Sequence, residues 1–106
     1  MKVEEILSLA DALKKNEISE EVKLHWLNEV EGRVHCEIFK SKVEDFVKLT
    51  ALDHELSVPM PYSKMYLSYI LAMIAFSSKE YDIYTDIMMQ YEQNFSQYAK
   101  FCLRQR

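Results

Sequence analysis

The sequence predicts an all-α fold: a small bundle of about four helices that ends in a helical hairpin. Two observations support this prediction. One glycine and two prolines among 106 residues leave little turn chemistry for β-hairpins or β-sandwiches. Apolar residues instead recur at helical steps of three and four along most of the chain. At this length we expect a single domain over residues 1–106, with a variable connecting segment at 40–58.

The first helix is predicted from the N-terminal segment, whose apolar residues follow the helical period from Val3 to Leu13. Lys14 and Lys15 would occupy its last turn, where the helix dipole favours cations. The polar pair at 16–17 is expected to end the helix.

The second helix is expected to begin after Ser19, a good N-cap residue, and to reach about residue 38. Its apolar face, widened by Leu27, is a series at steps of four: Val22, Trp26, Val30, Val34 and Ile38. Gly32 lies inside this helix at a cost of about 1 kcal/mol relative to alanine. Such a glycine indicates either a close neighbouring helix or simple tolerance. Glu29 and Arg33 are predicted to form an ordinary ion pair at spacing four.

The segment 40–58 has the least regular pattern. Its apolar residues fit either an extension of the second helix or a separate short helix: Val43, Phe46, Val47 and Leu49. Residues 53–61 are expected to form an extended connection, because residues before prolines avoid the helical region. Pro61 suits the first turn of a third helix, with Ser63 as its cap.

The last third of the chain predicts the helical hairpin. Residues 62–77 are apolar on nearly every side, so this helix is expected to be the central and most buried element. After a polar turn, a fourth helix at about 80–103 carries a stripe on one face: Tyr81, Tyr84, Met88, Tyr91, Phe95, Tyr98 and Cys102. Packing against the third helix explains most of this stripe, and a subunit interface is the alternative.

Aromatic residues are the candidates for the core or for a subunit interface, and the pattern leaves the choice between the two open. Buried tyrosine hydroxyls need hydrogen-bond partners. Trp and Tyr are also over-represented among the residues that dominate interface energies. The candidates are Trp26, Tyr66, Tyr69, Tyr81, Tyr84, Tyr91, Phe95 and Tyr98.

The sequence predicts no catalytic, cofactor-binding or metal-binding residues. The histidines lack metal-ligand spacing and are interpreted as surface residues: His25, His35 and His54. His35 and Cys36 are helix neighbours that point in different directions, so they cannot form a nucleophile–base pair. A single glycine disfavours a phosphate-binding loop. Cys36 and Cys102 are expected to be buried free thiols. An enzyme is therefore the least favoured class.

Charge and hydropathy indicate the environment of the chain. Residues 1–58 hold eight basic and thirteen acidic side chains, whereas residues 59–106 hold five and four. Neither half contains the basic block that DNA binding requires, and no basic recognition helix is present. The longest apolar run, at 65–76, is shorter than the roughly 20 residues that span a bilayer. Acidic residues interrupt the N-terminus where a signal peptide would be apolar. We expect a soluble intracellular protein that does not contact membranes.

Residues 58–101 contain, without gaps, a VPxPY lead-in, a tyrosine-rich apolar helix, an EYDxY turn and an aromatic-striped helix. This order resembles the C-terminal hairpin of small proteins encoded among the head genes of tailed bacteriophages and prophages. The matching residues are Val58, Pro59, Pro61, Tyr62, Tyr66, Tyr69, Ala72, Ile74, Phe76, Glu80, Tyr81, Asp82, Tyr84, Phe95, Tyr98 and Ala99. The stretch 20–34 is similar to the second helix of that family through Lys23, Trp26, Leu27, Glu29, Gly32 and Arg33. Ser78 and Lys79 replace a residue that is usually small or glycine, and 40–57 matches no family pattern.

The resemblance implies a head–tail connector, or adaptor, of long-tailed phages. Such proteins assemble as a ring under the portal and provide a platform for the head-closure protein and the tail. The implied partners are therefore copies of the chain, the portal, and head-closure and tail proteins. The implied location is the virion, and the host bacterial cytoplasm during assembly.

DNA would pass through such a ring without sequence-specific binding. The acidic residues of the N-terminal half are compatible with lining the channel: Glu4, Glu5, Glu20 and Glu21. The alternative function is a small prophage-encoded regulatory module that binds another protein, such as a repressor.

Overall fold

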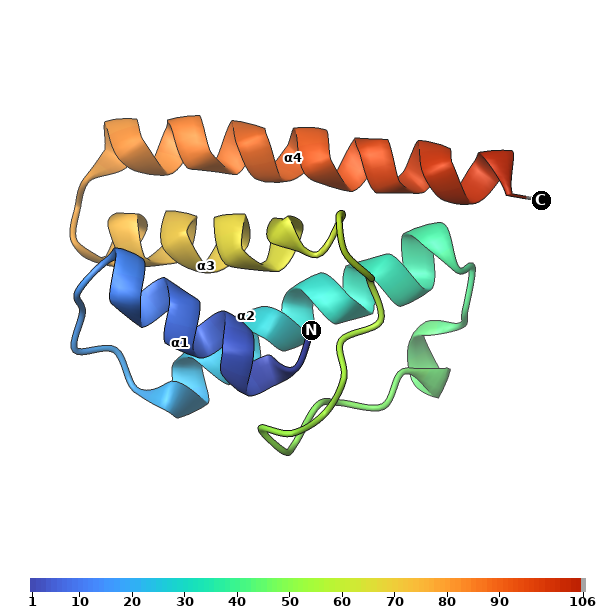
Figure 1. Cartoon of the computed structure of the whole chain (residues 1–106), viewed down its shortest axis with the longest axis horizontal. Helices are drawn as coiled ribbons and strands as arrows, with labels where there is room; N and C mark the ends of the chain where they lie inside the picture. Colours follow the sequence, from blue (N-terminus) through green and yellow to red (C-terminus); the bar gives the residue numbers. More distant parts are fainter. Residues whose placement is uncertain (106) are drawn as a thin grey trace.

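The computed structural model describes residues 1–105, and it confirms the all-α prediction. This range contains four α-helices: α1 (Val3–Leu13), α2 (Glu20–Arg33), α3 (Lys64–Ser77) and α4 (Tyr81–Arg104) (Figure 1). Its extended pairing is limited to one isolated bridge between Lys2 and Glu55. None of the helices in this range combines the length and the apolar character needed to cross a bilayer.

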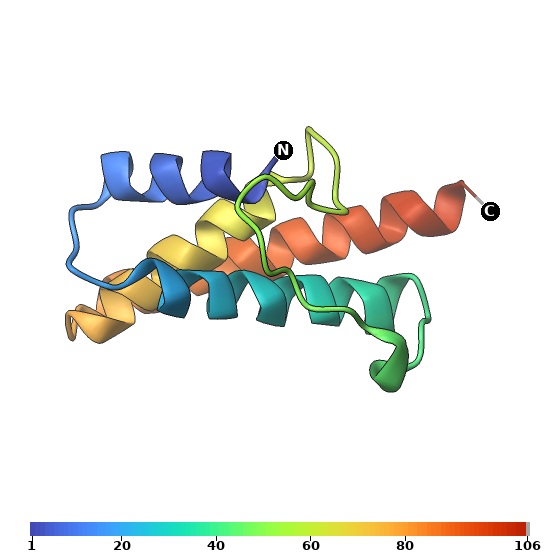
Figure 2. The same cartoon turned by 90° about the horizontal axis from the view of Figure 1, so that it is seen from below.

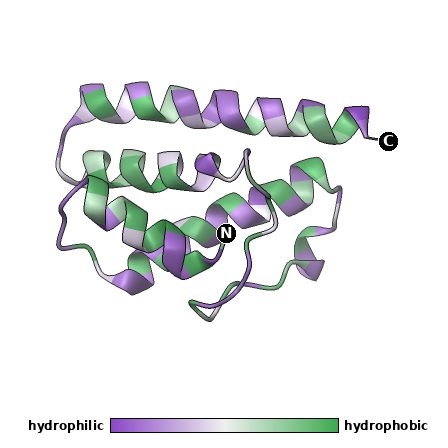
Figure 3. Ribbon diagram, viewed as in Figure 1, coloured by the Kyte–Doolittle hydropathy of each residue, from purple (hydrophilic) through white to green (hydrophobic). Residues whose placement is uncertain are grey.

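The helix α3 occupies the centre of the bundle, as predicted. It packs against α1, α2 and α4. The antiparallel α4 covers one side of α3, while α1 and α2 lie on the other (Figures 1 and 2). Most residues of α3 itself are apolar, whereas polar and apolar residues alternate along α4 (Figure 3). Burying α3 from both sides therefore creates the single core of the bundle.

The end of α1 differs from the prediction. Leu13 is the last helical residue, so Lys14 is the C-cap and Lys15 lies beyond the helix. The prediction that both lysines occupy the last turn is therefore wrong. The Nζ atom of Lys14 instead lies 2.7 Å from Oε1 of Glu80, because the end of α1 lies close to the turn between α3 and α4.

The helix α2 follows the prediction closely. The Oγ atom of Ser19 accepts a hydrogen bond from the backbone N–H of Val22 at 3.3 Å, which confirms the N-cap. Beyond Arg33 the helix widens into a π-helix, η1 (Val34–Ile38). The apolar face is buried except for Val22, which is 41% exposed because it lies in the first turn at the edge of the bundle.

The segment 40–58 does not extend α2. It contains one turn of 3₁₀ helix, η2 (Val43–Asp45), and is otherwise irregular. Val43 and Val47 are 75% and 84% exposed, whereas Leu49 is buried. Too few of its apolar side chains can reach the core for a helix here to be stabilised by packing.

Backbone contacts fix the second part of this segment against the N-terminus. The amide of Val3 donates to the carbonyl of His54 at 3.0 Å, and the amide of Leu56 donates to the carbonyl of Met1 at 2.8 Å. The chain near residue 54 thus satisfies an amide in the first turn of α1, which no intrahelical acceptor could reach.

The start of α3 also differs from the prediction. The helix begins at Lys64, so Pro61 lies in the preceding turn, after a cis peptide bond. The hydroxyl of Ser63 makes no capping bond, because carbonyls of the preceding turn already serve as acceptors. One example is the amide of Met65, which donates to the carbonyl of Tyr62 at 3.3 Å.

The turn between α3 and α4 lies at 78–80, where the sequence predicts it. Lys79 has a φ of 61°, in the left-handed region that glycine adopts without strain. Glycine would suit this position because it has no Cβ atom to strain the left-handed conformation.

Candidate interaction site

The aromatic stripe of α4 pairs with aromatic residues of α3 and the turn before it. The three pairs are Tyr62 with Tyr98, Tyr69 with Tyr91, and Phe76 with Tyr84. Their ring centroids lie 5.4, 5.0 and 5.0 Å apart. We call these pairs the first, second and third rungs of an aromatic ladder. From one rung to the next, the residue number rises by seven on the α3 side and falls by seven on the antiparallel α4. Seven residues are about two helical turns, so the ladder fixes the register of the hairpin.

The helix α2 covers the ladder through Arg33. The guanidinium carbon lies 3.8 Å from the ring centre of Phe95 and 5.7 Å from that of Tyr91. Nη1 donates to Glu92 at 2.9 Å and to the Tyr91 hydroxyl at 3.4 Å, while Nε donates to Glu37 at 2.9 Å. Burial acts to lower the pKa of Arg33, but the hydrogen bonds to Glu92 and Tyr91 raise it overall. Arg33 therefore stays charged and holds α2 against α4.

The stripe residues of the first and second rungs belong to the core of the chain. Tyr91, Phe95 and Tyr98 are at most 5% exposed. Burial, followed by a hydrogen bond with Cys102, raises the pKa of Tyr98 to about 12. Burial also raises the pKa of Tyr69, whose hydroxyl donates to Glu29 at 3.1 Å. Most of the stripe thus packs within the chain, which was the favoured interpretation of the pattern.

The third rung remains open to solvent. Phe76 is 48% exposed, and its neighbour Tyr81 is 53% exposed, with ring centroids 5.6 Å apart. Tyr84 is half-buried. We call Phe76, Tyr81 and Tyr84 the open rung. A shallow groove continues from it along α4, lined by Tyr84, Thr85, Met88, Met89, Glu92 and Gln93.

The open rung joins one exposed aromatic residue of α3 to the two accessible tyrosines at the start of the stripe, so another molecule can reach it. Exposed aromatic side chains on a rigid helical hairpin are typical of interaction surfaces. Of the eight sequence candidates, the structure places Tyr81 and Tyr84 here. It places the other six in the core or against it: Trp26, Tyr66, Tyr69, Tyr91, Phe95 and Tyr98.

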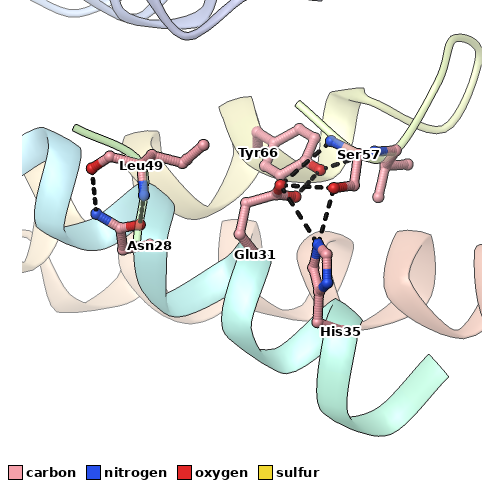
Figure 4. A network of polar contacts seen from close by, with 7 residues as sticks. Asn28, Glu31, His35, Leu49, Ser57 and Tyr66 are labelled. Carbon is pink, nitrogen blue, oxygen red and sulfur yellow. Dashed lines mark hydrogen bonds and ion pairs between the residues drawn. The ribbon is translucent and has the colours of Figure 1, made fainter. Parts of the chain in front are cut away.

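On the side of α3 that faces α2, a buried carboxylate is the centre of a hydrogen-bond network (Figure 4). Glu31 is 2% exposed, and one of its oxygens accepts a hydrogen bond from the Tyr66 hydroxyl. Its other oxygen accepts from the Ser57 hydroxyl at 2.8 Å and from the Ser57 amide at 3.2 Å. The Tyr66 hydroxyl in turn accepts from the amide of Val58 at 3.0 Å. Burial, reinforced by Glu31, raises the pKa of Tyr66, so its phenol stays protonated and acts as a donor.

His35, which the sequence predicts to be a surface residue, is partly enclosed. Its side chain is only 32% exposed, and Nε2 lies 2.9 Å from the Ser57 hydroxyl and 3.9 Å from Glu31. Because the Ser57 proton is directed at Glu31, the Nε2–H of His35 is the donor. The Ser57 hydroxyl therefore donates its proton to Glu31 and accepts a hydrogen bond from His35. Both bonds attach the connecting segment at Ser57 to α2 and η1. General-base activation would need the opposite proton direction, from serine to histidine.

Two buried charged residues of α2, Lys23 and Glu31, were not predicted from the sequence. Glu31 and Lys23 are 2% and 4% exposed, and Lys23 pairs with Asp11 of α1 at 2.6 Å. A hydrogen bond from Lys23 lowers the pKa of Asp11. Their burial could have been predicted from their positions, because both residues share the apolar face with Leu27 and Val30 at helical spacing.

The pair predicted between Glu29 and Arg33 does not form. Glu29 lies 3.4 Å from His25 and accepts from Tyr69, while Arg33 pairs with Glu37 and Glu92. Contacts from α3 and α4 outcompete the local pair.

The nearest atoms to a side chain at Gly32 would come from the ring of Phe46 and not from a neighbouring helix. A methyl group placed there would meet the ring of Phe46 at 3.6 Å, an ordinary contact. The glycine is therefore tolerated, which was one of the two interpretations of the sequence. Cys36 and Cys102 are free but half-buried, so they are less enclosed than predicted.

Within residues 1–105, no group of three His, Cys, Asp or Glu side chains could hold a metal ion. Comparisons of the chain with protein-family models, with curated protein sequences and with solved structures found no match.

Proposed function

We propose that this chain is a structural virion protein, a head–tail connector that forms a ring under the portal of a long-tailed phage. Its partners would be copies of itself, the portal, and head-closure and tail proteins. The proposal rests on the resemblance of residues 58–101 to phage connector hairpins. The structural observation that supports it is the open rung, an aromatic surface left uncovered at the end of the hairpin.

The open rung has the properties of an assembly contact. Phe76 and Tyr81 expose about half of their surface, and they are aromatic residues of the kind that anchor interfaces. Further along the hairpin, the first and second rungs and the side chain of Arg33 hold α4 in a fixed position relative to α3 and α2. A pre-organised surface loses little conformational entropy on binding, which favours ordered assembly.

A connector ring must also let DNA slide without gripping its phosphates. The four acidic residues named for this role are all exposed: Glu4, Glu5, Glu20 and Glu21. We infer that they face the channel. Replacing all four with lysine should impair DNA retention or ejection in phage particles. Unchanged DNA retention and ejection would contradict the inference that these four acidic residues face the channel.

The proposal is tested by co-expression with the portal protein encoded in the same genome. A tag on the portal should co-purify the chain in a fixed ratio. The variant Tyr81→Ala should reduce this ratio at least tenfold, whereas Leu9→Ala, an exposed apolar residue on α1, should not. Recovery of the portal without the chain would contradict the proposal. Capture of a repressor by a chain that ignores the portal would favour the regulatory alternative.

A further inference from the structure

The side of α4 that faces away from α3 carries charges placed symmetrically about Gln93. Asp86 and Lys100 each lie seven positions from Gln93, while Asp82 and Arg104 each lie eleven positions from it. All four side chains are exposed, and none forms an ion pair within residues 1–105. The acidic pair precedes Gln93, and the basic pair follows it.

These residues lie on one face of the helix. Steps of three and four connect the series Asp82, Asp86, Met89, Gln93, Gln97, Lys100 and Arg104. This face is opposite the aromatic stripe, so nothing in the bundle covers it. Met89 within the series and Leu103 beside it are 59% and 61% exposed.

The helix dipole accounts for only part of this arrangement. It favours acids in the first turn and bases in the last turn, and its effect fades beyond those turns. Asp82 and Arg104 occupy the terminal turns of α4. Asp86 and Lys100 lie further inside, so their symmetry requires another explanation.

We propose that this face of α4 binds the same face of a second copy of the chain, antiparallel and around a two-fold axis at Gln93. Asp86 then lies opposite the partner's Lys100, and Asp82 lies opposite the partner's Arg104. The two-fold axis repeats both contacts, so the dimer gains four ion pairs. Met89 packs across the axis from the partner's Gln97, and antiparallel helix dipoles add a favourable term.

A parallel arrangement in register would place like charges together at all four positions, and this repulsion specifies the antiparallel orientation. The ion pairs lie at the surface, so the dimer should dissociate as salt screens them. This inference concerns the free protein and does not rest on the proposed function. A connector could form this dimer before it meets the portal.

Charge exchange tests the register directly. By sedimentation equilibrium at low salt, Asp86→Lys and Lys100→Asp should each raise the dimer dissociation constant at least about tenfold. An equimolar mixture of the two variants should form a heterodimer, because each reversed charge then meets its complement. Continued weak association of the mixture, or a monomeric unmodified chain at low salt, would overturn the proposal.

Cross-linking tests the position of the axis without relying on affinity. In a chain with Cys36→Ala and Cys102→Ala, the variant Gln93→Cys should form a disulfide-linked dimer under mild oxidation. The matched variant Gln97→Cys should not, because four residues of rise on each helix separate the two thiols by about 12 Å along the axis. Circular dichroism establishes that both variants fold. Equal cross-linking of the two variants would contradict the two-fold arrangement.

Discussion

The phenol hydroxyl of Tyr66 donates a hydrogen bond to the buried carboxylate of Glu31 and thereby joins the last turn of α2 to the first turn of α3. The same hydroxyl accepts from Val58, and the carboxylate also accepts from Ser57. The end of the connecting segment is thus held by one buried charge. Removing any single partner should leave that charge incompletely hydrogen-bonded.

The variant Tyr66→Phe should lower the free energy of unfolding by about 3 kcal/mol. It leaves a buried carboxylate oxygen without its donor and the Val58 amide without its acceptor. Urea denaturation measures the loss. The control is Tyr62→Phe, since the Tyr62 hydroxyl makes no hydrogen bond within the described range, and its effect should stay within about 0.5 kcal/mol. Equal effects of the two variants would contradict the role of Glu31.

The variant Gly32→Ala should stabilise the protein by up to about 1 kcal/mol. Alanine restores helix propensity in α2, and its methyl group meets only the Phe46 ring at an ordinary contact distance. Thermal denaturation should show a higher midpoint. A lower midpoint would mean that the ring of Phe46 cannot tolerate the added methyl group.

Stability should fall as the pH rises from about 10 to 12. The unfolded state releases tyrosine protons near pH 10, whereas Tyr98 in the folded state keeps its proton up to about pH 12. Unfolding therefore releases protons in this window, and the stabilising contribution is fully present below pH 10. In urea titrations, Tyr98→Phe should reduce the slope by about 1.4 kcal/mol per pH unit. An unchanged slope would show that Tyr98 does not ionise differently in the two states.

Core and open-rung tyrosines should respond differently to truncation. Tyr98→Ala should cost about 3–5 kcal/mol, because it leaves a cavity at a position only 5% exposed. Tyr81→Ala should cost less than about 1 kcal/mol, because this side chain is 53% exposed. Denaturation of both variants measures the contrast. A large loss of stability for Tyr81→Ala would assign this residue to the fold instead of the interaction surface.

The helices and the hairpin could be predicted because their apolar periodicity is local. The network at Glu31 could not, since its partner Ser57 lies 26 positions away in an irregular segment. The predicted ion pair between Glu29 and Arg33 was wrong for a similar reason. Their actual partners include Tyr69 and Glu92, which come from other helices. The division of the aromatic stripe into core and open rung depends partly on which rings the side chain of Arg33 covers, and the periodicity of α4 does not encode this contact.

If the chain is a connector, it should form a complex of defined mass with the portal. Light scattering should be measured on the chain alone, on the purified portal, and on their mixture at moderate salt. For a connector, we expect the mixture to give one species whose added mass corresponds to a ring of chains in a fixed ratio to portal subunits. Two unchanged species, a portal ring and a free chain, would contradict it.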